Sequence, residues 1–282
     1  MPDEVAAAAD MIGGAQALLV TAGAGMGVDS GLPDFRGSEG FWRAYPPYAR
    51  LGLRFEELAD PEHFADDPEL AWGFYGHRLE LYRQTVPHTG FDILRRWART
   101  RPTTVFTSNV DGHFQRAGFP ADDVAEVHGS IHHLQCLRLC GYGVWPADGP
   151  DGSIDVPVDE DTMRATGPLP RCPGCGALAR PAILMFGDTG WDESHAAPAL
   201  ARHADWLRER RGTGLAVVEL GAGTAVPTVR RRSELASAAS GALVRINVRE
   251  PEIRHDRGVG IAGPAAATLT AIDDALGRPG TG

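Results

Sequence analysis

The sequence predicts a doubly wound α/β fold, because short apolar runs alternate with amphipathic helical segments along most of the chain. Runs that are apolar throughout are typical of strands in a parallel sheet covered on both faces. Glycine, asparagine and aspartate follow them, as expected of ligand-binding loops at the carboxyl edge of such a sheet. The five runs are Ala17–Thr21, Thr103–Thr107, Ala182–Phe186, Leu215–Leu220 and Leu243–Val248.

Helical periodicity fills the intervals between these runs, and two stretches interrupt the alternation. The helices are expected at Glu69–Tyr82, Gly90–Arg99, Ala199–Arg210 and Pro227–Ala239. Residues 42–85 are aromatic and helical without a strand, and residues 131–180 hold all four cysteines. We therefore predict a large domain of residues 1–41, 86–130 and 181–282, and a smaller inserted domain of residues 42–85 and 131–180.

The composition excludes several functions. All 27 Lys+Arg residues are arginines, so neither a Schiff-base lysine nor a P-loop lysine exists. The 37 acidic residues give a net charge of −10, which argues against a nucleic-acid partner. No apolar run reaches the roughly 18–20 residues that span a bilayer, so we expect no membrane partner. The first ten residues lack the basic start of a signal peptide, and a cytoplasmic location is expected.

A glycine-rich turn, TAGAGMGVDSGLPDFRG, follows the first predicted strand and spans Thr21–Gly37. Such a turn lets backbone amides approach a pyrophosphate, although a simple turn is the alternative. It is not the dehydrogenase fingerprint, because the G-x-G-x-x-G spacing fails at Val28. The three residues Asp34, Phe35 and Arg36 suggest a lid, in which the arginine contacts phosphate and the phenyl ring covers the ligand.

Two further motifs place polar groups beside strands. In TSNVD, Asn109 and Asp111 follow a strand and are expected at the sheet edge, with an ordinary Asx turn as the alternative. In VHGS, His128 follows the apolar residues Val124 and Val127 and precedes Gly129. Histidine is the natural general base near neutral pH, so His128 is a candidate, although a packing or surface histidine is the alternative.

The cysteines form two close pairs, Cys136-x3-Cys140 and Cys172-x2-Cys175. Two such pairs separated by a loop are typical of a tetrahedral four-thiolate zinc site, with free thiols as the alternative. Four thiolates fill the coordination shell, so we expect one structural zinc per chain. The neighbouring His132 or His133 would be a substitute ligand if Cys140 lay elsewhere.

Taken together and in this order, these motifs resemble those of sirtuins, the NAD-dependent protein-lysine deacylases, in their bacterial form. The resemblance runs from Ala15 to Ile261 and also includes RPAILMFGD and the strand ending at Asn247-Val248. It implies a Rossmann-like large domain and a small domain built from a helical module and a zinc module. It also implies that the chain removes acyl groups from a lysine-containing protein or peptide, releasing nicotinamide and O-acyl-ADP-ribose.

The resemblance also assigns roles to residues. His128 would be the general base, with Asn109 facing the nicotinamide ribose and Asp111 facing the carboxamide. The other residues implied for the NAD site are Ala22, Gly23, Ala24, Asp34, Phe35, Arg36, Ser108, Gly221, Ala222, Gly223, Asn247, Val248 and Arg249. Phe186 and Gly187 would border the acyl-lysine groove.

One local feature suggests the acyl group. Tyr75 and Arg78 resemble the Tyr-x-x-Arg pair of sirtuins that remove succinyl or malonyl groups. Residues three apart on a helix share a face, so the arginine would pair with an acyl carboxylate while the tyrosine hydrogen-bonds it. The alternative is a packing tyrosine beside a surface arginine.

The sequence departs from the family pattern at three places in the expected NAD site, and its first cysteine pair is one residue wider than the commonest spacing. Gly27 replaces a serine, Ser108 replaces a glutamine, and Ala222-Gly223 replaces Thr-Ser in the adenosine loop. These changes leave open an ADP-ribosyltransferase, an NAD hydrolase, or a non-catalytic NAD or ADP-ribose sensor. The sequence specifies neither the protein substrate nor the oligomeric state.

Overall fold

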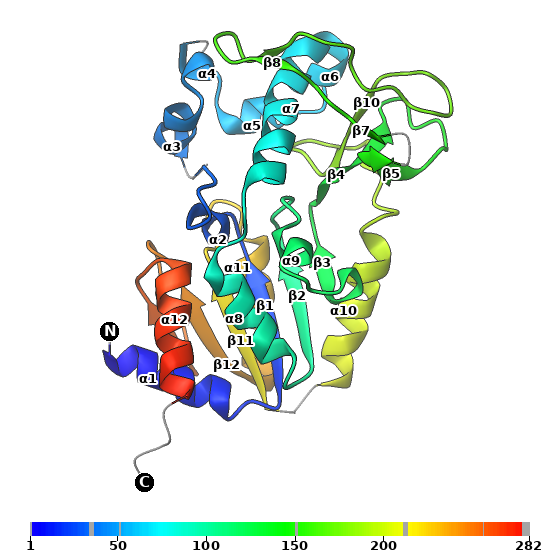
Figure 1. Cartoon of the computed structure of the whole chain (residues 1–282). Helices are drawn as coiled ribbons and strands as arrows, with labels where there is room; N and C mark the ends of the chain where they lie inside the picture. Colours follow the sequence, from blue (N-terminus) through cyan, green and yellow to red (C-terminus); the bar gives the residue numbers. More distant parts are fainter. Residues whose placement is uncertain are drawn as a thin grey trace.

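The computed structural model describes residues 2–33, 37–50, 52–149, 152–210, 214–255 and 257–277. Figure 1 shows a sheet flanked by helices, with a smaller lobe of helices and short strands above the carboxyl edge of the sheet. Among the described helices, none combines the length and the apolar character that crossing a membrane requires.

The large sheet has six parallel strands in the order β13-β12-β11-β1-β2-β3. The strands are β1 (Ala17–Ala22), β2 (Thr103–Thr107), β3 (Val124–Glu126), β11 (Leu215–Leu220), β12 (Gly241–Ile246) and β13 (Gly258–Ile261). Read from the β3 edge, this is the 3-2-1-4-5-6 order of a Rossmann fold. The strand order reverses between β1 and β11, and ligands bind at that switch point in folds of this kind.

Helices cover both faces of this sheet (Figure 1). One face carries α1 (Pro2–Gly13), α8 (Thr89–Ala98) and α12 (Ala265–Leu276), and the other carries α10 (Ala197–Glu209) and α11 (Thr228–Ser240). Strand β1 shows why its sequence is apolar throughout. Leu18 and Val20 pack into the cluster on one face, while Ala17 and Leu19 pack into the cluster on the other.

The doubly wound α/β prediction is therefore confirmed, and four of the five predicted strands belong to the parallel sheet. The prediction for Ala182–Phe186 is wrong. That run contributes to β10 (Ala179–Ile183), which pairs antiparallel with β4 (Gly129–Cys136) in a separate sheet. A fully buried antiparallel strand has the same apolar signature as a parallel one, so periodicity did not separate the two cases.

The small lobe combines a helical part with a set of short strands. The helices are α3 (Gly37–Ala44), α4 (Pro46–Arg50), α5 (Phe55–Leu58), α6 (His63–Asp66) and α7 (Pro68–Gln84). The short strands are β5 (Val144–Pro146), β6 (Asp148–Gly149), β7 (Gly152–Ser153), β8 (Val158–Asp159) and β9 (Arg164–Ala165). The short helices α2 (Gly25–Val28), α9 (His113–Arg116) and η1 (Ala121–Asp123) lie in connections of the large sheet.

An aromatic core fills this lobe. Phe41, Tyr45 and Phe74 form tilted and edge-on ring contacts with centroids 5.4–6.0 Å apart. This cluster is distinct from the two that line the parallel sheet. The separation supports the proposed two-domain division, whose boundaries stay a prediction.

Candidate active site

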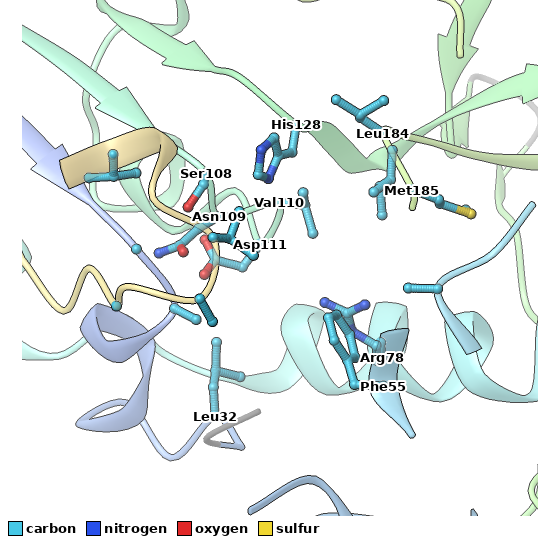
Figure 2. Close-up of a pocket in the computed structure, with 18 of the residues that line it drawn as sticks. Leu32, Phe55, Arg78, Ser108, Asn109, Val110, Asp111, His128, Leu184 and Met185 are labelled. Carbon is cyan, nitrogen blue, oxygen red and sulfur yellow. The ribbon is translucent and has the colours of Figure 1, made fainter. Parts of the chain in front are cut away.

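A pocket of about 410 Å³ lies between the carboxyl edge of the parallel sheet and helix α7. Figure 2 shows Ser108, Asn109 and Asp111 on the sheet side, and Arg78 and Phe55 on the side of the small lobe. Twelve residues predicted from the sequence line it: Gly23, Ala24, Tyr75, Arg78, Ser108, Asn109, Asp111, His128, Phe186, Gly221, Ala222 and Gly223. The volume falls in the range of small-molecule sites in proteins.

Two glycine-rich loops meet at the switch point of the sheet. Gly221 has a φ of +60°, and a Cβ there would lie 2.3 Å from the backbone of Gly25 and Met26. A Cβ on Gly23 would lie 2.9 Å from the backbone of Gly221 and Ala222. Since the loops contact each other through their backbones, these positions require glycine, and both loops present main chain to the pocket.

Three hydrogen bonds hold the loop that carries Asn109 and Asp111. The Thr107 hydroxyl donates to the carbonyl oxygen of Ala22 at 3.1 Å and accepts from the Asn109 amide at 3.0 Å. The carboxylate of Asp111 accepts the His113 amide at 3.0 Å. Both polar side chains are buried in the pocket wall, and the hydrogen bond from His113 orients the Asp111 carboxylate before any ligand arrives.

His128 lies in the short connection between β3 and β4, across the pocket from Arg78 (Figure 2). Burial lowers the pKa of its imidazole, and a hydrogen bond to the Ser108 backbone acts in the opposite direction. The next residue, Gly129, has a φ of +75°, and a Cβ there would lie 2.0 Å from the Ala182 carbonyl oxygen. Because Gly129 has no side chain, β10 can pass close to the backbone next to His128. The lowered pKa favours the neutral imidazole of His128.

The Ala222 carbonyl oxygen is held by two side chains. It accepts the Nε donor of Arg230 at 3.0 Å and the amide of Asn247 at 2.9 Å. The Asn247 side chain is thus engaged behind the loop, and Asn247, Val248, Arg249 and Ala22 are not among the pocket-lining residues. Sequence reasoning missed Arg230, which reads as part of a charged helix face.

Arg78 is buried on α7 among aromatic rings. Its Cζ atom lies 5.1–5.8 Å from the ring centroids of Phe55, Phe74, Tyr75 and Tyr82. The Tyr82 hydroxyl accepts from Nη2 at 2.7 Å and from Nε at 3.2 Å. The surface-arginine alternative is therefore wrong, because Arg78 is only 6% exposed. Tyr82 was missed, although it lies four residues after Arg78 on the same helical face.

The segment after β10 forms another wall of the pocket. Leu184 and Met185 line it, and the Phe186 amide donates to the Ala59 carbonyl oxygen at 2.9 Å, joining this segment to the helical part. Gly187 adopts a φ of +66° and does not line the pocket. Asp188 forms a buried ion pair with Arg180 at 2.8 Å, which fixes the turn.

Three predicted NAD-site residues, Asp34, Phe35 and Arg36, lie outside the described residues. On either side of them, Pro33 lines the pocket and helix α3 begins at Gly37.

A second buried carboxyl group, that of Glu126, lies near Asp111 of the pocket wall. Glu126 ends β3 and is 8% exposed. Burial raises the pKa of Glu126 to about 8, the charge of Asp111 acts in the same direction, and a hydrogen bond with Gln115 opposes both. No pattern in the sequence singles out Glu126, because a single acid at a strand end is common.

The four cysteines converge in the small lobe. The sulfurs of Cys136, Cys140, Cys172 and Cys175 all lie within 4.8 Å of one another, and two pairs are 3.6 Å apart. Zn–S bonds of about 2.3 Å in a tetrahedron place sulfurs about 3.8 Å apart, so this set fits one zinc ion. Neither histidine is needed as a substitute, since His132 bonds the Asp111 carbonyl oxygen and His133 stacks on His195.

The comparisons with known proteins agree with this geometry. The model of the Sir2 family matches residues 23–218, which includes most of the pocket-lining loops. The chain belongs to the Sir2 family.

Relatives in the Sir2 family cover nearly the whole chain. A Pyrobaculum aerophilum protein named NAD-dependent protein deacylase 2 is 33% identical over 272 residues, 96% of this chain and 95% of that protein. A Pseudomonas aeruginosa protein named NAD-dependent protein deacylase 1 is 31% identical over 266 residues, 93% and 95% of the two chains. A solved Sir2 homologue in complex with ADP-ribose is 25% identical, with a TM-score of 0.73 over 96% of this chain and 95% of that one.

The departures from the Sir2 pattern lie at or beside the pocket. Ser108 and Ala222-Gly223 line it, whereas Gly27 is buried under the first loop. A Cβ at Gly27 would lie 2.9 Å from Leu32 Cδ1, so a serine there requires that side chain to shift.

Proposed function

We propose that this chain is an NAD-dependent protein-lysine deacylase that acts on acyl groups ending in a carboxylate, such as succinyl and malonyl. One observation carries the proposal. A single pocket joins the half-buried His128, whose pKa is lowered, and the Asn109–Asp111 wall to the buried Arg78. Sir2 membership and the names of the full-length relatives support the NAD-dependent deacylase part.

The residues present fit NAD at the switch point. Backbone from the two glycine loops would hold the pyrophosphate and adenosine half, and Asn109 and Asp111 would hold the nicotinamide ribose and carboxamide. NAD supplies a ribose carbon that becomes electrophilic as nicotinamide leaves. The buried Asp111 carboxyl group and the side-chain oxygen of Asn109 would stabilise positive charge there.

His128 acts as the general base in this proposal. Its lowered pKa keeps the imidazole neutral near pH 7, so with NAD bound it would be placed to accept the proton of a ribose hydroxyl. The backbone hydrogen bond to Ser108 orients the ring. In the overall reaction the acyl oxygen would replace nicotinamide on the ribose carbon, and water would then release free lysine and O-acyl-ADP-ribose.

The peptide would enter beside Phe186 and its neighbours, between the two lobes. Phe186 is 42% exposed, lines the pocket and contacts the Phe55 ring edge-on at 6.2 Å. An acyl-lysine side chain that passed this pair would lie between Arg78 and His128, which Figure 2 shows on different sides of the pocket. We also propose the domain division given above, which places this entrance at the junction.

The test incubates the protein with NAD and a succinyl-lysine peptide and measures nicotinamide, free lysine peptide and O-acyl-ADP-ribose. Equal amounts of all three support the proposal. Nicotinamide formed without peptide indicates an NAD hydrolase, and ADP-ribose on protein indicates a transferase. NAD binding without any turnover indicates a sensor.

A further inference from the structure

Tyr82 is a pocket residue to which the proposed function gives no role. It lies on α7 beside Arg78, is 4% exposed, and lines the pocket. Its hydroxyl accepts two hydrogen bonds from Arg78, at 2.7 Å and 3.2 Å. These contacts use Nε and Nη2, which together form the side edge of the guanidinium.

The hydroxyl proton of Tyr82 has no acceptor among the described residues. Within residues 2–277, apart from the undescribed gaps, the two contacts from Arg78 are the only hydrogen bonds of this oxygen, and in both of them it accepts. Burial raises the pKa of Tyr82, so the phenol keeps its proton at neutral pH even though the charge of Arg78 opposes this. A buried donor without an acceptor is costly, and a ligand acceptor relieves that cost.

The surroundings select an anionic acceptor. Arg78 keeps its positive charge, and the Tyr75 hydroxyl, three residues earlier, makes no hydrogen bond within the described part of the chain. Burial raises the pKa of Tyr75 to about 12, so it is also a donor at neutral pH. Two phenol donors and one guanidinium therefore lie together in an apolar aromatic wall.

We propose that Tyr82 is a specificity-determining residue that donates its hydroxyl proton to the terminal carboxylate of the acyl group. Its oxygen holds the side edge of Arg78, which directs the end edge, Nη1 and Nη2, at the same carboxylate. The inference rests on the proposed function and adds a third donor to the Tyr75–Arg78 pair. A neutral acyl chain of similar length offers no acceptor to these groups and leaves Tyr82 unsatisfied.

The experiment compares succinyl-lysine and butyryl-lysine peptides, which have acyl chains of similar length and differ by the carboxylate. Tyr82→Phe removes only the hydroxyl. The matched control is Tyr48→Phe, which removes a buried hydroxyl that bonds the Met163 carbonyl oxygen at 3.2 Å outside the pocket. Thermal unfolding of both variants shows whether each is folded, and Tyr82→Met serves as a second variant without a hydroxyl.

We expect Tyr82→Phe to lower the succinyl-to-butyryl ratio of kcat/KM about tenfold, as for loss of one hydrogen bond to a charged group. The change should lie mainly in the KM of the succinyl peptide, and Tyr48→Phe should keep the wild-type ratio. Equal losses on both peptides would show a purely structural role and overturn the inference. If Arg78→Met lowers the succinyl-to-butyryl ratio but Tyr82→Phe leaves it unchanged, the inference is also overturned, while the proposed function stands. A wild-type protein without deacylation would overturn both.

Discussion

The Nε atom of Arg230 donates a hydrogen bond to the Ala222 carbonyl oxygen at 3.0 Å, so a helix of the sheet layer holds the second glycine loop. Neither Ala222 nor Gly223 has a side-chain hydroxyl, and the shape of the loop depends on Arg230 and Asn247 behind it. These two side chains thus stabilise the proposed NAD site from the side of the loop that faces away from the pocket.

Arg230→Gln should weaken NAD binding, because the buried carbonyl oxygen loses a charged donor. Such a loss is worth about 1–2 kcal/mol, or roughly a 5- to 30-fold rise in the KM for NAD. Steady-state kinetics with NAD varied at saturating peptide give this value. The neighbouring exposed Arg231→Gln is the control, and an equal rise in both variants would argue against a specific contact.

His128→Ala should reduce deacylation to background while the protein still binds NAD. In the wild type, the lowered pKa of His128 keeps the base form present below pH 6.5. The acidic limb of the kcat/KM profile should therefore fall below that pH. His63→Ala, on α6 and outside the pocket, is the control. Undiminished turnover in His128→Ala would refute the role of the base.

Arg78→Met should lower desuccinylation far more than deacetylation, because only the succinyl group has a carboxylate to pair with the guanidinium. The expected drop in the ratio of the two kcat/KM values is at least tenfold, the size of a lost charged hydrogen bond. Parallel assays on acetyl- and succinyl-lysine peptides measure it. Equal losses on both substrates would exclude recognition of the acyl carboxylate.

Glu126→Gln should flatten the pH dependence of stability. The folded state holds the Glu126 proton up to about pH 8, its raised pKa, while the unfolded chain releases it near pH 4.5. The stability that this proton contributes is therefore present below pH 4.5 and lost as the pH rises to 8, by at most about 1.4 kcal/mol per unit.

Urea unfolding at pH 5.5 and 8.5 tests this effect. We expect the wild type to lose more stability over this interval than Glu126→Gln. The exposed Glu193→Gln should behave as the wild type does. Identical curves for all three proteins would show that Glu126 ionises normally in the folded state.

Removing zinc should unfold the small lobe. Among the residues that the structure describes, the cluster around the cysteines buries only Cys136, Cys172 and Ala177, with Trp145 packed against them, so metal binding supplies much of the folding energy of this part. We expect a strong chelator to lower the unfolding temperature and abolish activity, and one equivalent of Zn²⁺ to restore both. Cys172→Ser should reproduce the loss. Unfolding curves that do not change when the chelator is added would contradict a structural metal.

Local signals in the sequence predicted much of this structure, and long-range contacts limited the rest. The strand at Leu215–Leu220 and the converging cysteines follow from short patterns, and the structure has both. The strand that includes Ala182 was assigned to the wrong sheet, because an apolar run does not indicate which strand it pairs with. Arg230 and Glu126 were missed, since their importance comes from burial beside Ala222 and Asp111.

A competition reaction tests the central claim most directly. The protein receives NAD and equal concentrations of acetyl-lysine and succinyl-lysine peptides, and mass spectrometry follows the O-acyl-ADP-ribose products. We predict that O-succinyl-ADP-ribose predominates and that nicotinamide equals the sum of the two acyl products. Nicotinamide that accumulates without either acyl product would contradict the account.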